Sequence, residues 1–167
     1  MVGRYSINGQ DLWTAFGVIV ISGSQDLLKM PERKEPFSHD WGDGNGIEVD
    51  LSSPKFKDKN ITLDVCFLAG SEADFWTKYR AFFTLLSGSG KLRLYCNDLG
   101  RSFYVYYTNS SSFEKLTPIK YAGQRKIGCR FSISFIEPEP SFWIPFTFLV
   151  DKDGNYITTT DNSLIIV

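Results

Sequence analysis

Residues Asn60 to Gly90, NITLDVCFLAGSEADFWTKYRAFFTLLSGSG, carry the clearest structural pattern in the chain. The first part of this stretch alternates between two faces, which is typical of a β-strand with one face on a core. The residues on the apolar face are Ile61, Leu63, Val65 and Phe67. Its second part places large apolar side chains at helical spacing on one stripe. These are Phe75, Tyr79, Phe82, Phe83 and Leu86. The stretch predicts a strand followed by a helix that docks on a sheet.

The limits of this helix, about 72–87, follow from its flanking residues. Ser71 is a suitable N-cap, Glu72 and Asp74 place negative charge in the first turn, and Gly88 follows the last turn. We interpret the aromatic stripe as core and not as a ligand site.

Downstream, three further stretches alternate: KLRLYCND (91–98), RSFYVYYTN (101–109) and KIGCRFSISFIEPEP (126–140). Turn-forming residues separate them, so they predict an antiparallel meander. Tyr104 and Tyr106 fall on the face opposite Phe103 and Val105, and we therefore expect both faces of this strand to be covered.

Upstream, residues 4–23 predict two strands, with a turn at Asn8-Gly9 and residues 11–17 as the connection. The last residues predict a hairpin around Asp153-Gly154 and a final strand, about 144–167. Together these elements predict a single domain over residues 1–167 of the α+β, mainly β class. We expect two packed antiparallel β-sheets, as a sandwich or a partly open barrel, with one flanking α-helix.

Residues 24–39, SQDLLKMPERKEPFSH, lose all periodicity and contain Pro31 and Pro36. Such a long connection is uncommon in compact domains and is often functional, so we predict an arm here. We expect four apolar arm residues to bury surface against a neighbouring subunit. They are Leu27, Leu28, Met30 and Phe37.

The glycine-rich stretch DWGDGNGIEVDL (40–51) follows the arm. It lacks the G-K-[ST] ending of a phosphate loop, and a strand-like segment follows it where a dinucleotide loop requires a helix. We predict a turn over Asp40–Gly46 that leads into a strand at IEVDL. Weak cation binding by Asp40 and Asp43 is the alternative.

Composition excludes several function classes. The chain has 167 residues, 18 Lys and Arg against 19 Asp and Glu, and a formal charge of -1, which argues against sequence-specific nucleic-acid binding. Its longest apolar runs are far shorter than the ~20 residues of a membrane span. The N-terminus also lacks a signal-peptide pattern. We expect no membrane partner.

The residues that could carry chemistry are few. Cys66, Cys96 and Cys129 lie in strand-like stretches without a C-x-x-C pair, and His39 is the single histidine. This excludes standard zinc sites and favours buried reduced thiols, with a Cys–His39 catalytic pair as the alternative. DKDGN (151–155) departs from the calcium-loop pattern and favours a hairpin turn. A carboxylate pair for glycoside hydrolysis stays open, although no pair is singled out. We expect no catalytic residue, cofactor or metal.

The order of these parts resembles that of tail proteins of long-tailed bacteriophages and prophages. A long loop ends in HDWGDGNGIEVDL, the strand and aromatic helix follow, and a CRFSISFIEPEP strand closes the pattern. The resemblance covers about residues 5–140. It is strongest to the N-terminal ring-forming domain of distal tail proteins, to which tail-tube and type VI secretion tube proteins are related.

This resemblance implies a structural protein of the virion tail or baseplate, assembled in the bacterial cytoplasm. It implies a long loop that reaches a neighbouring subunit, contacts with other tail proteins, and a hexameric ring around a channel for DNA. Distal tail proteins often add a galectin-like second domain. Only 27 residues follow Pro140, so we expect no second sandwich here.

Two functions therefore compete. The first is a ring-forming tail protein, in the distal-tail or the tail-tube position. The second is a carbohydrate-binding β module, because exposed rings stack on sugars. Its candidate residues are Trp13, Trp41, Trp76 and Trp143. An enzyme is a distant third.

Overall fold

The structure, a computed structural model, describes residues 3–120 and 126–140. Within this part, seven strands form one antiparallel sheet in the order β2-β1-β7-β8-β9-β6-β3. Their bounds are β1 (Tyr5–Ile7), β2 (Gln10–Asp11), β3 (Val18–Ser22), β6 (Lys59–Ala69), β7 (Leu92–Cys96), β8 (Arg101–Lys115) and β9 (Ile127–Glu137). A separate pair consists of β4 (Ser38–His39) and β5 (Glu48–Val49). The helices are α1 (Leu12–Phe16), α2 (Gln25–Leu28) and α3 (Glu72–Leu86).

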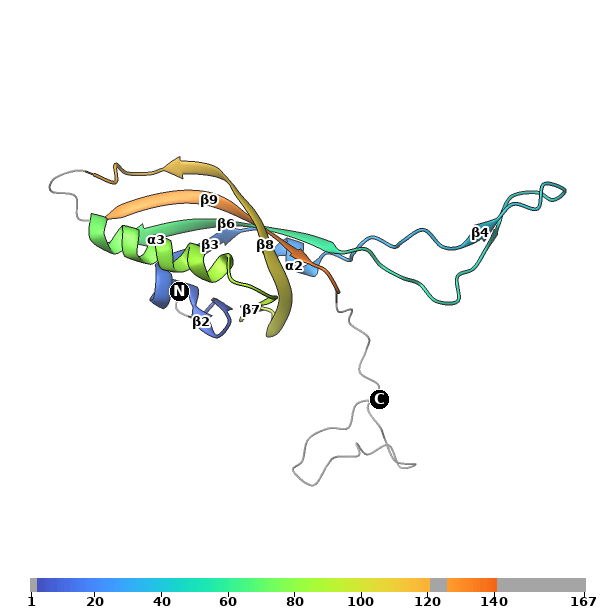
Figure 1. Cartoon of the computed structure of the whole chain (residues 1–167), viewed down its shortest axis with the longest axis horizontal. Helices are drawn as coiled ribbons and strands as arrows, with labels where there is room; N and C mark the ends of the chain where they lie inside the picture. Colours follow the sequence, from blue (N-terminus) through green and yellow to red (C-terminus); the bar gives the residue numbers. More distant parts are fainter. Residues whose placement is uncertain (1–2, 121–125, 141–167) are drawn as a thin grey trace, which may run out of the picture.

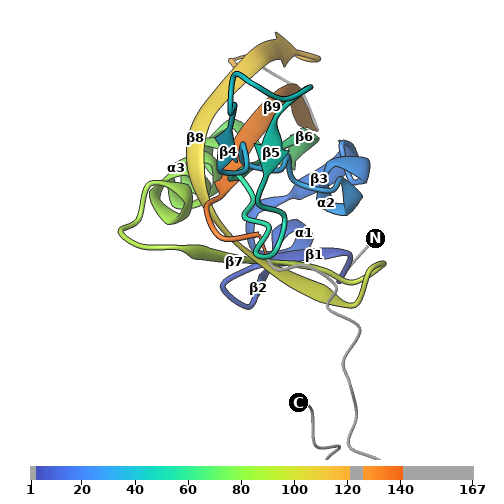
Figure 2. The same ribbon diagram turned by 90° about the vertical axis from the view of Figure 1, so that its right-hand side faces the viewer.

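The long strand β8 belongs to two halves of the sheet. Its first residues, from Arg101 to Val105, pair with β7, whereas Tyr106 to Lys115 pair with β9. Figure 2 shows β7 and β1 running across below β6 and β9, with β8 curving from one half to the other. The two predicted sheets are thus present as halves of one continuous sheet. The α+β, mainly β class is confirmed.

The core lies between the concave side of this sheet and α3 (Figure 1). The predicted inward face of β6 is confirmed, because Ile61, Leu63, Val65 and Phe67 are all buried. The helix α3 contributes Phe75, Phe82 and Leu86 to the same core. Burial of each large side chain stabilises the fold by ~2 kcal/mol, so the packing of α3 on the sheet contributes substantially to the free energy of folding.

The helix α3 occupies the residues that the sequence predicts. The Ser71 side chain accepts a hydrogen bond of 3.2 Å from the Asp74 N–H, as an N-cap should. Tyr79 and Phe83 are half-buried, and their rings touch the sheet-side aromatic residues Phe67 and Phe131. The aromatic stripe is therefore core, as predicted.

Four local expectations need correction. The predicted connection at residues 11–17 contains the helix α1, and the predicted arm begins with the helix α2. The predicted IEVDL strand is reduced to the two residues of β5. Tyr104 and Tyr106 are exposed, so the outer face of β8 is not covered there. Alternation alone could not reveal this, since a tyrosine tolerates either environment.

The thiol prediction holds for two of the three cysteines. Cys96 and Cys129 are buried, whereas Cys66 points to the outer face and is half-buried. The predicted hairpin and strand at 144–167, with Asp153-Gly154 and Trp143, lie outside the described residues.

Candidate functional site

A two-legged arm projects from one end of the sheet, over residues 29–58 (Figure 1). It leaves the body after α2 and returns at the start of β6, so it extends well beyond the predicted limit at His39. Backbone hydrogen bonds tie its legs together, from Lys34 N–H to the Lys55 carbonyl at 2.9 Å and from Lys57 N–H to the Glu32 carbonyl at 2.8 Å. The arm is therefore a ribbon of paired backbone rather than a free loop.

At the far end of the arm, β4 and β5 pair and residues 40–46 connect them. The Asp40 carboxylate accepts a 2.9 Å hydrogen bond from the Gly42 N–H, and Gly42 and Gly46 have φ of 69° and 81°. Such positive φ values favour glycine. The predicted turn is confirmed: it is the loop of a hairpin.

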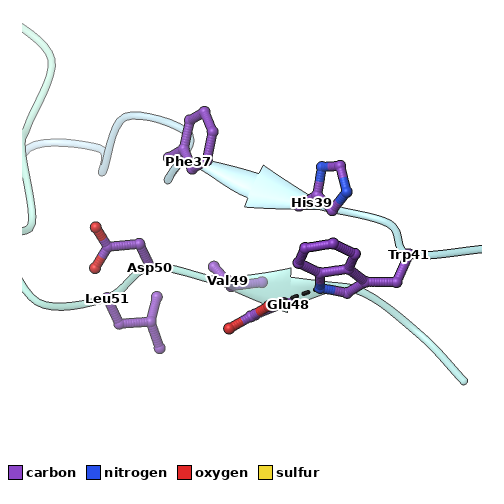
Figure 3. A pocket seen from close by; sticks show the side chains of 7 residues that line it. All are labelled: Phe37, His39, Trp41, Glu48, Val49, Asp50 and Leu51. Atoms are coloured by element: carbon purple, nitrogen blue, oxygen red, sulfur yellow. Dashed lines mark hydrogen bonds between the residues drawn. The ribbon is translucent and has the colours of Figure 1, made fainter. Parts of the chain in front are cut away.

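One face of this hairpin forms a hollow lined by aromatic, aliphatic and acidic side chains. Figure 3 shows the Trp41 ring beside Val49, with its Nε1 atom donating a 2.7 Å hydrogen bond to Glu48. The His39 ring meets the Trp41 ring edge-on, with centroids 4.3 Å apart. Hydrogen bonds from Ser52 hold the pKa of Asp50 below its ordinary value. The hollow therefore combines stacking surface with negative charge.

Exposed apolar side chains continue along the arm. Phe37 is 79% exposed, Met30 68%, Leu28 66% and Trp41 65%. Ile47 and Leu51 are exposed as well. Several exposed apolar side chains on one projecting segment indicate an interaction site. Three of the four predicted interface residues are thus available to a partner.

Leu27, the fourth, is only 3% exposed and belongs to the core. The sequence analysis placed it on an irregular arm, but α2 turns its side chain inward against the body. Its side chain is already buried within the chain, so Leu27 has no surface to offer to a neighbouring subunit.

A buried ion pair anchors the base of the arm. The Nζ atom of Lys59, the first residue of β6, donates a 3.0 Å hydrogen bond to the Leu27 carbonyl and lies 3.1 Å from Oε2 of Glu137. Lys59 also lies over the Phe103 ring, 5.2 Å from its centroid. This pair was not predicted from the sequence. Lys59 and Glu137 nevertheless fall on the same alternating positions as the buried residues of β6 and β9, so both side chains point inward.

The remaining candidates for chemistry do not come together. His39 lies on the arm, whereas Cys66, Cys96 and Cys129 lie in the sheet. Among the described residues, no group of three or more His, Cys, Asp or Glu side chains is placed to hold a metal ion. Within the same residues, no helix is long and apolar enough to cross a membrane.

The described tryptophans are on separate elements: Trp13 on α1, Trp41 on the arm and Trp76 on α3. Trp13 is half-buried, and Trp76 packs edge-on against Phe75. Trp41 lines the hollow described above with Glu48 and Asp50, and Trp13 lines a smaller hollow with Asp11, whose carboxylate accepts a 2.8 Å hydrogen bond from the Thr14 N–H.

Comparison with known proteins finds a match among solved structures. No family model matches the chain, and no curated protein matches it. A solved structure that it resembles is SPP1 Dit (gp 19.1), described as a paradigm of the hub adsorption apparatus in phages that infect Gram-positive bacteria. The TM-score is 0.55 at 15% identity, over 82% of this chain and 50% of the Dit chain. The chain thus spans about half the length of its structural neighbour and shares the fold of that part.

Proposed function

We propose that this chain is a structural component of a phage or prophage tail, in the distal-tail (hub) or tail-tube position. The fold shared with SPP1 Dit supports this role. The order of strand, aromatic helix and meander, noted above from the sequence alone, supports it independently. We infer a place in the virion tail, with assembly in the bacterial cytoplasm, and a role without catalysis.

We propose further that copies of the chain assemble into a ring around a channel for DNA; the family resemblance implies six subunits. The observation that carries self-assembly is the arm. The side chains of Leu28, Met30, Phe37 and Trp41, on the arm or at its base, are exposed to solvent. Burial of their apolar surface against another subunit would stabilise the assembly. A stable interface of this kind buries ~1,200 to 2,000 Å² in total.

Light scattering after size-exclusion chromatography tests this proposal. We expect the intact chain to give a mass near six subunits and rings in negative-stain images. A variant with residues 31–57 replaced by a short Gly/Ser linker should be a folded monomer, because Lys59 and Glu137 still close the base of the body. A folded deletion variant that still forms rings would place the ring interface elsewhere.

The hollow at Trp41 supports a second candidate function, which is carbohydrate binding. The exposed Trp41 ring donates a hydrogen bond to Glu48, and Asp50 lies at the other end of the same hollow (Figure 3). Both carboxylates can accept hydrogen bonds from sugar hydroxyls. Retention of a monomeric chain on a glycan array, lost in Trp41→Ala, would favour this reading. If neither the wild-type chain nor Trp41→Ala is retained on the array, carbohydrate binding is excluded and the structural role remains the proposed function.

A further inference from the structure

The arm divides into two parts of opposite charge. We call residues 37–51 the arm tip. The arm base comprises residues 29–35 and 54–58, together with the adjoining residues Leu27, Leu28 and Lys59 of the body. The arm tip has no Lys or Arg, and its carboxylates are Asp40, Asp43, Glu48 and Asp50. The arm base has six cations, Lys29, Arg33, Lys34, Lys55, Lys57 and Lys59, against the carboxylates Glu32, Glu35 and Asp58.

Part of the positive charge of the arm base is already neutralised. Lys57 pairs with Glu32, Lys59 with Glu137, and Lys29 with Asp26. Within the described part of the chain, no ion pair engages Arg33, Lys34 or Lys55. Glu35 and Asp50 line a hollow with Lys34 and Lys55, and Glu139, which pairs with Lys91 at 2.7 Å, lines a neighbouring one. The arm base therefore keeps three cations outside any ion pair among the described residues, with carboxylates beside two of them.

The arm base also has an apolar hollow of about 280 Å³. It is walled mainly by Leu28, Met30, Pro31, Phe56 and Phe103, with cationic side chains at its margin and no carboxylate in its lining. The arm tip presents the complementary surface, since Phe37, Trp41 and Ile47 are exposed next to carboxylates.

The loop 40–47, which joins β4 to β5, lies at the far end of the arm from the body (Figure 1). Nearer the body, Phe37 and Asp50 of the arm tip line one hollow with Lys34 and Lys55 of the arm base. Backbone pairing between the two legs keeps the loop away from its own base, so a contact between them would require the ribbon to break. A second copy can provide the contact without any such cost.

We propose that the arm tip of one copy docks on the arm base of the next, with apolar side chains of the tip over the hollow and its carboxylates toward Lys34 and Lys55. This inference rests on the self-assembly proposed above and names its acceptor surface. The contact is head-to-tail, so each copy gives one tip and receives another. Such heterologous contacts close into rings when the rotation between copies allows it.

Charge reversal tests the electrostatic part. Asp43→Lys with Glu48→Lys reverses the tip, and Lys34→Glu with Lys55→Glu reverses the base. Each double variant should raise the dissociation constant for self-association at least about tenfold at low salt. Combining all four substitutions, or mixing the two double variants, should restore assembly. Asp98→Lys with Glu114→Lys, at exposed sites on the body, is the control for net charge and should assemble normally.

Cross-linking tests the location. In a Cys66→Ser background, a chain with Ile47→Cys is mixed with a chain with Met30→Cys and treated with a short bis-maleimide. A covalent dimer should form in the mixture and in neither variant alone. Replacing Met30→Cys by Tyr104→Cys, on the exposed outer face of β8, should abolish it.

Three results would contradict the proposed contact between arm tip and arm base. Oligomers that ignore the charge reversals and give no cross-link would refute this contact while leaving self-assembly intact. A wild-type chain that stays monomeric at every concentration would refute both. Protection of Met30→Cys from a thiol reagent in the monomeric tip-reversed chain would show that the chain's own residues, such as 141–167, cover the hollow.

Discussion

Lys59 and Glu137 form an ion pair with both side chains buried, their Nζ and Oε2 atoms lying 3.1 Å apart. Lys59 begins β6 where the arm returns to the body, and Glu137 ends β9 directly opposite, in register. The Leu27 carbonyl takes a further hydrogen bond from Lys59. One lysine therefore joins both legs of the arm base to the sheet.

Removal of one partner should destabilise the body strongly. Lys59→Met leaves the Glu137 carboxylate buried without its cation, and the loss of one member of a buried pair typically costs ~3 to 5 kcal/mol. Urea unfolding should show this as a lower midpoint. Lys91→Met, which breaks the exposed pair with Glu139, is the matched control and should leave the midpoint almost unchanged. Equal effects of the two substitutions would contradict the role of burial.

The helix α3 offers a second test of burial. Phe82 is fully buried and its ring lies 5.4 Å from that of Phe16, so Phe82→Ala should cost ~3 to 5 kcal/mol. Phe83 is half-buried and should cost less when truncated. Thermal melts of both variants, beside Thr84→Ala on the exposed face, should rank in this order. A Phe82→Ala melt that coincides with wild type would contradict the docking of α3.

The cysteines should differ in reactivity. Burial raises the pKa of the Cys129 thiol from its ordinary 9.0 to about 11, and Cys129 and Cys96 are shielded from reagent. Labelling of the native protein should therefore modify Cys66 first, and mass spectrometry after proteolysis can identify the site. Rapid native labelling of Cys129 would contradict its place in the core.

The same shift predicts a pH dependence. Between pH 9 and about 11 the unfolded chain has lost the Cys129 proton while the folded chain retains it, so the free energy of unfolding falls as pH rises through this window. The loss amounts to about 1.4 kcal/mol for each pKa unit of difference. Cys129→Ala should flatten this part of the pH profile. An unchanged slope in that variant would assign the dependence to other groups, such as Tyr5, whose pKa burial raises to about 12.

Much of the body could be predicted from the sequence because its signals are local. The alternation in β6 and β9 and the caps of α3 are each set by neighbouring residues. The buried partner of Lys59 could not be predicted, because a strand gives the parity of a side chain but not its register with another strand. The same limit applies to Leu27, whose burial depends on how α2 packs.

The arm shows the other limit of sequence reasoning. Loss of periodicity located its first leg, but the return leg resembled an ordinary loop and the short strands β4 and β5 carry little pattern. Pairing of Arg33 with Phe56 joins residues far apart in the sequence. The uneven distribution of charge along residues 27–59 is present in the sequence. Only the pairing of the two legs shows that the cations gather at the base and the carboxylates at the tip.

The last prediction concerns the hairpin loop Asp40–Gly46. The Asp40 carboxylate is engaged by the Gly42 N–H at 2.9 Å, which is the role of an aspartate in a turn. Asp40→Asn with Asp43→Asn should therefore leave any effect of Ca²⁺ or Mg²⁺ on the melting temperature unchanged. Gly46→Ala, by contrast, forces a Cβ into a φ of 81° and should loosen the hairpin by ~1 kcal/mol, seen as faster amide exchange at β4 and β5. A metal-induced shift in melting temperature that disappears in the double Asn variant would show that the loop binds a cation.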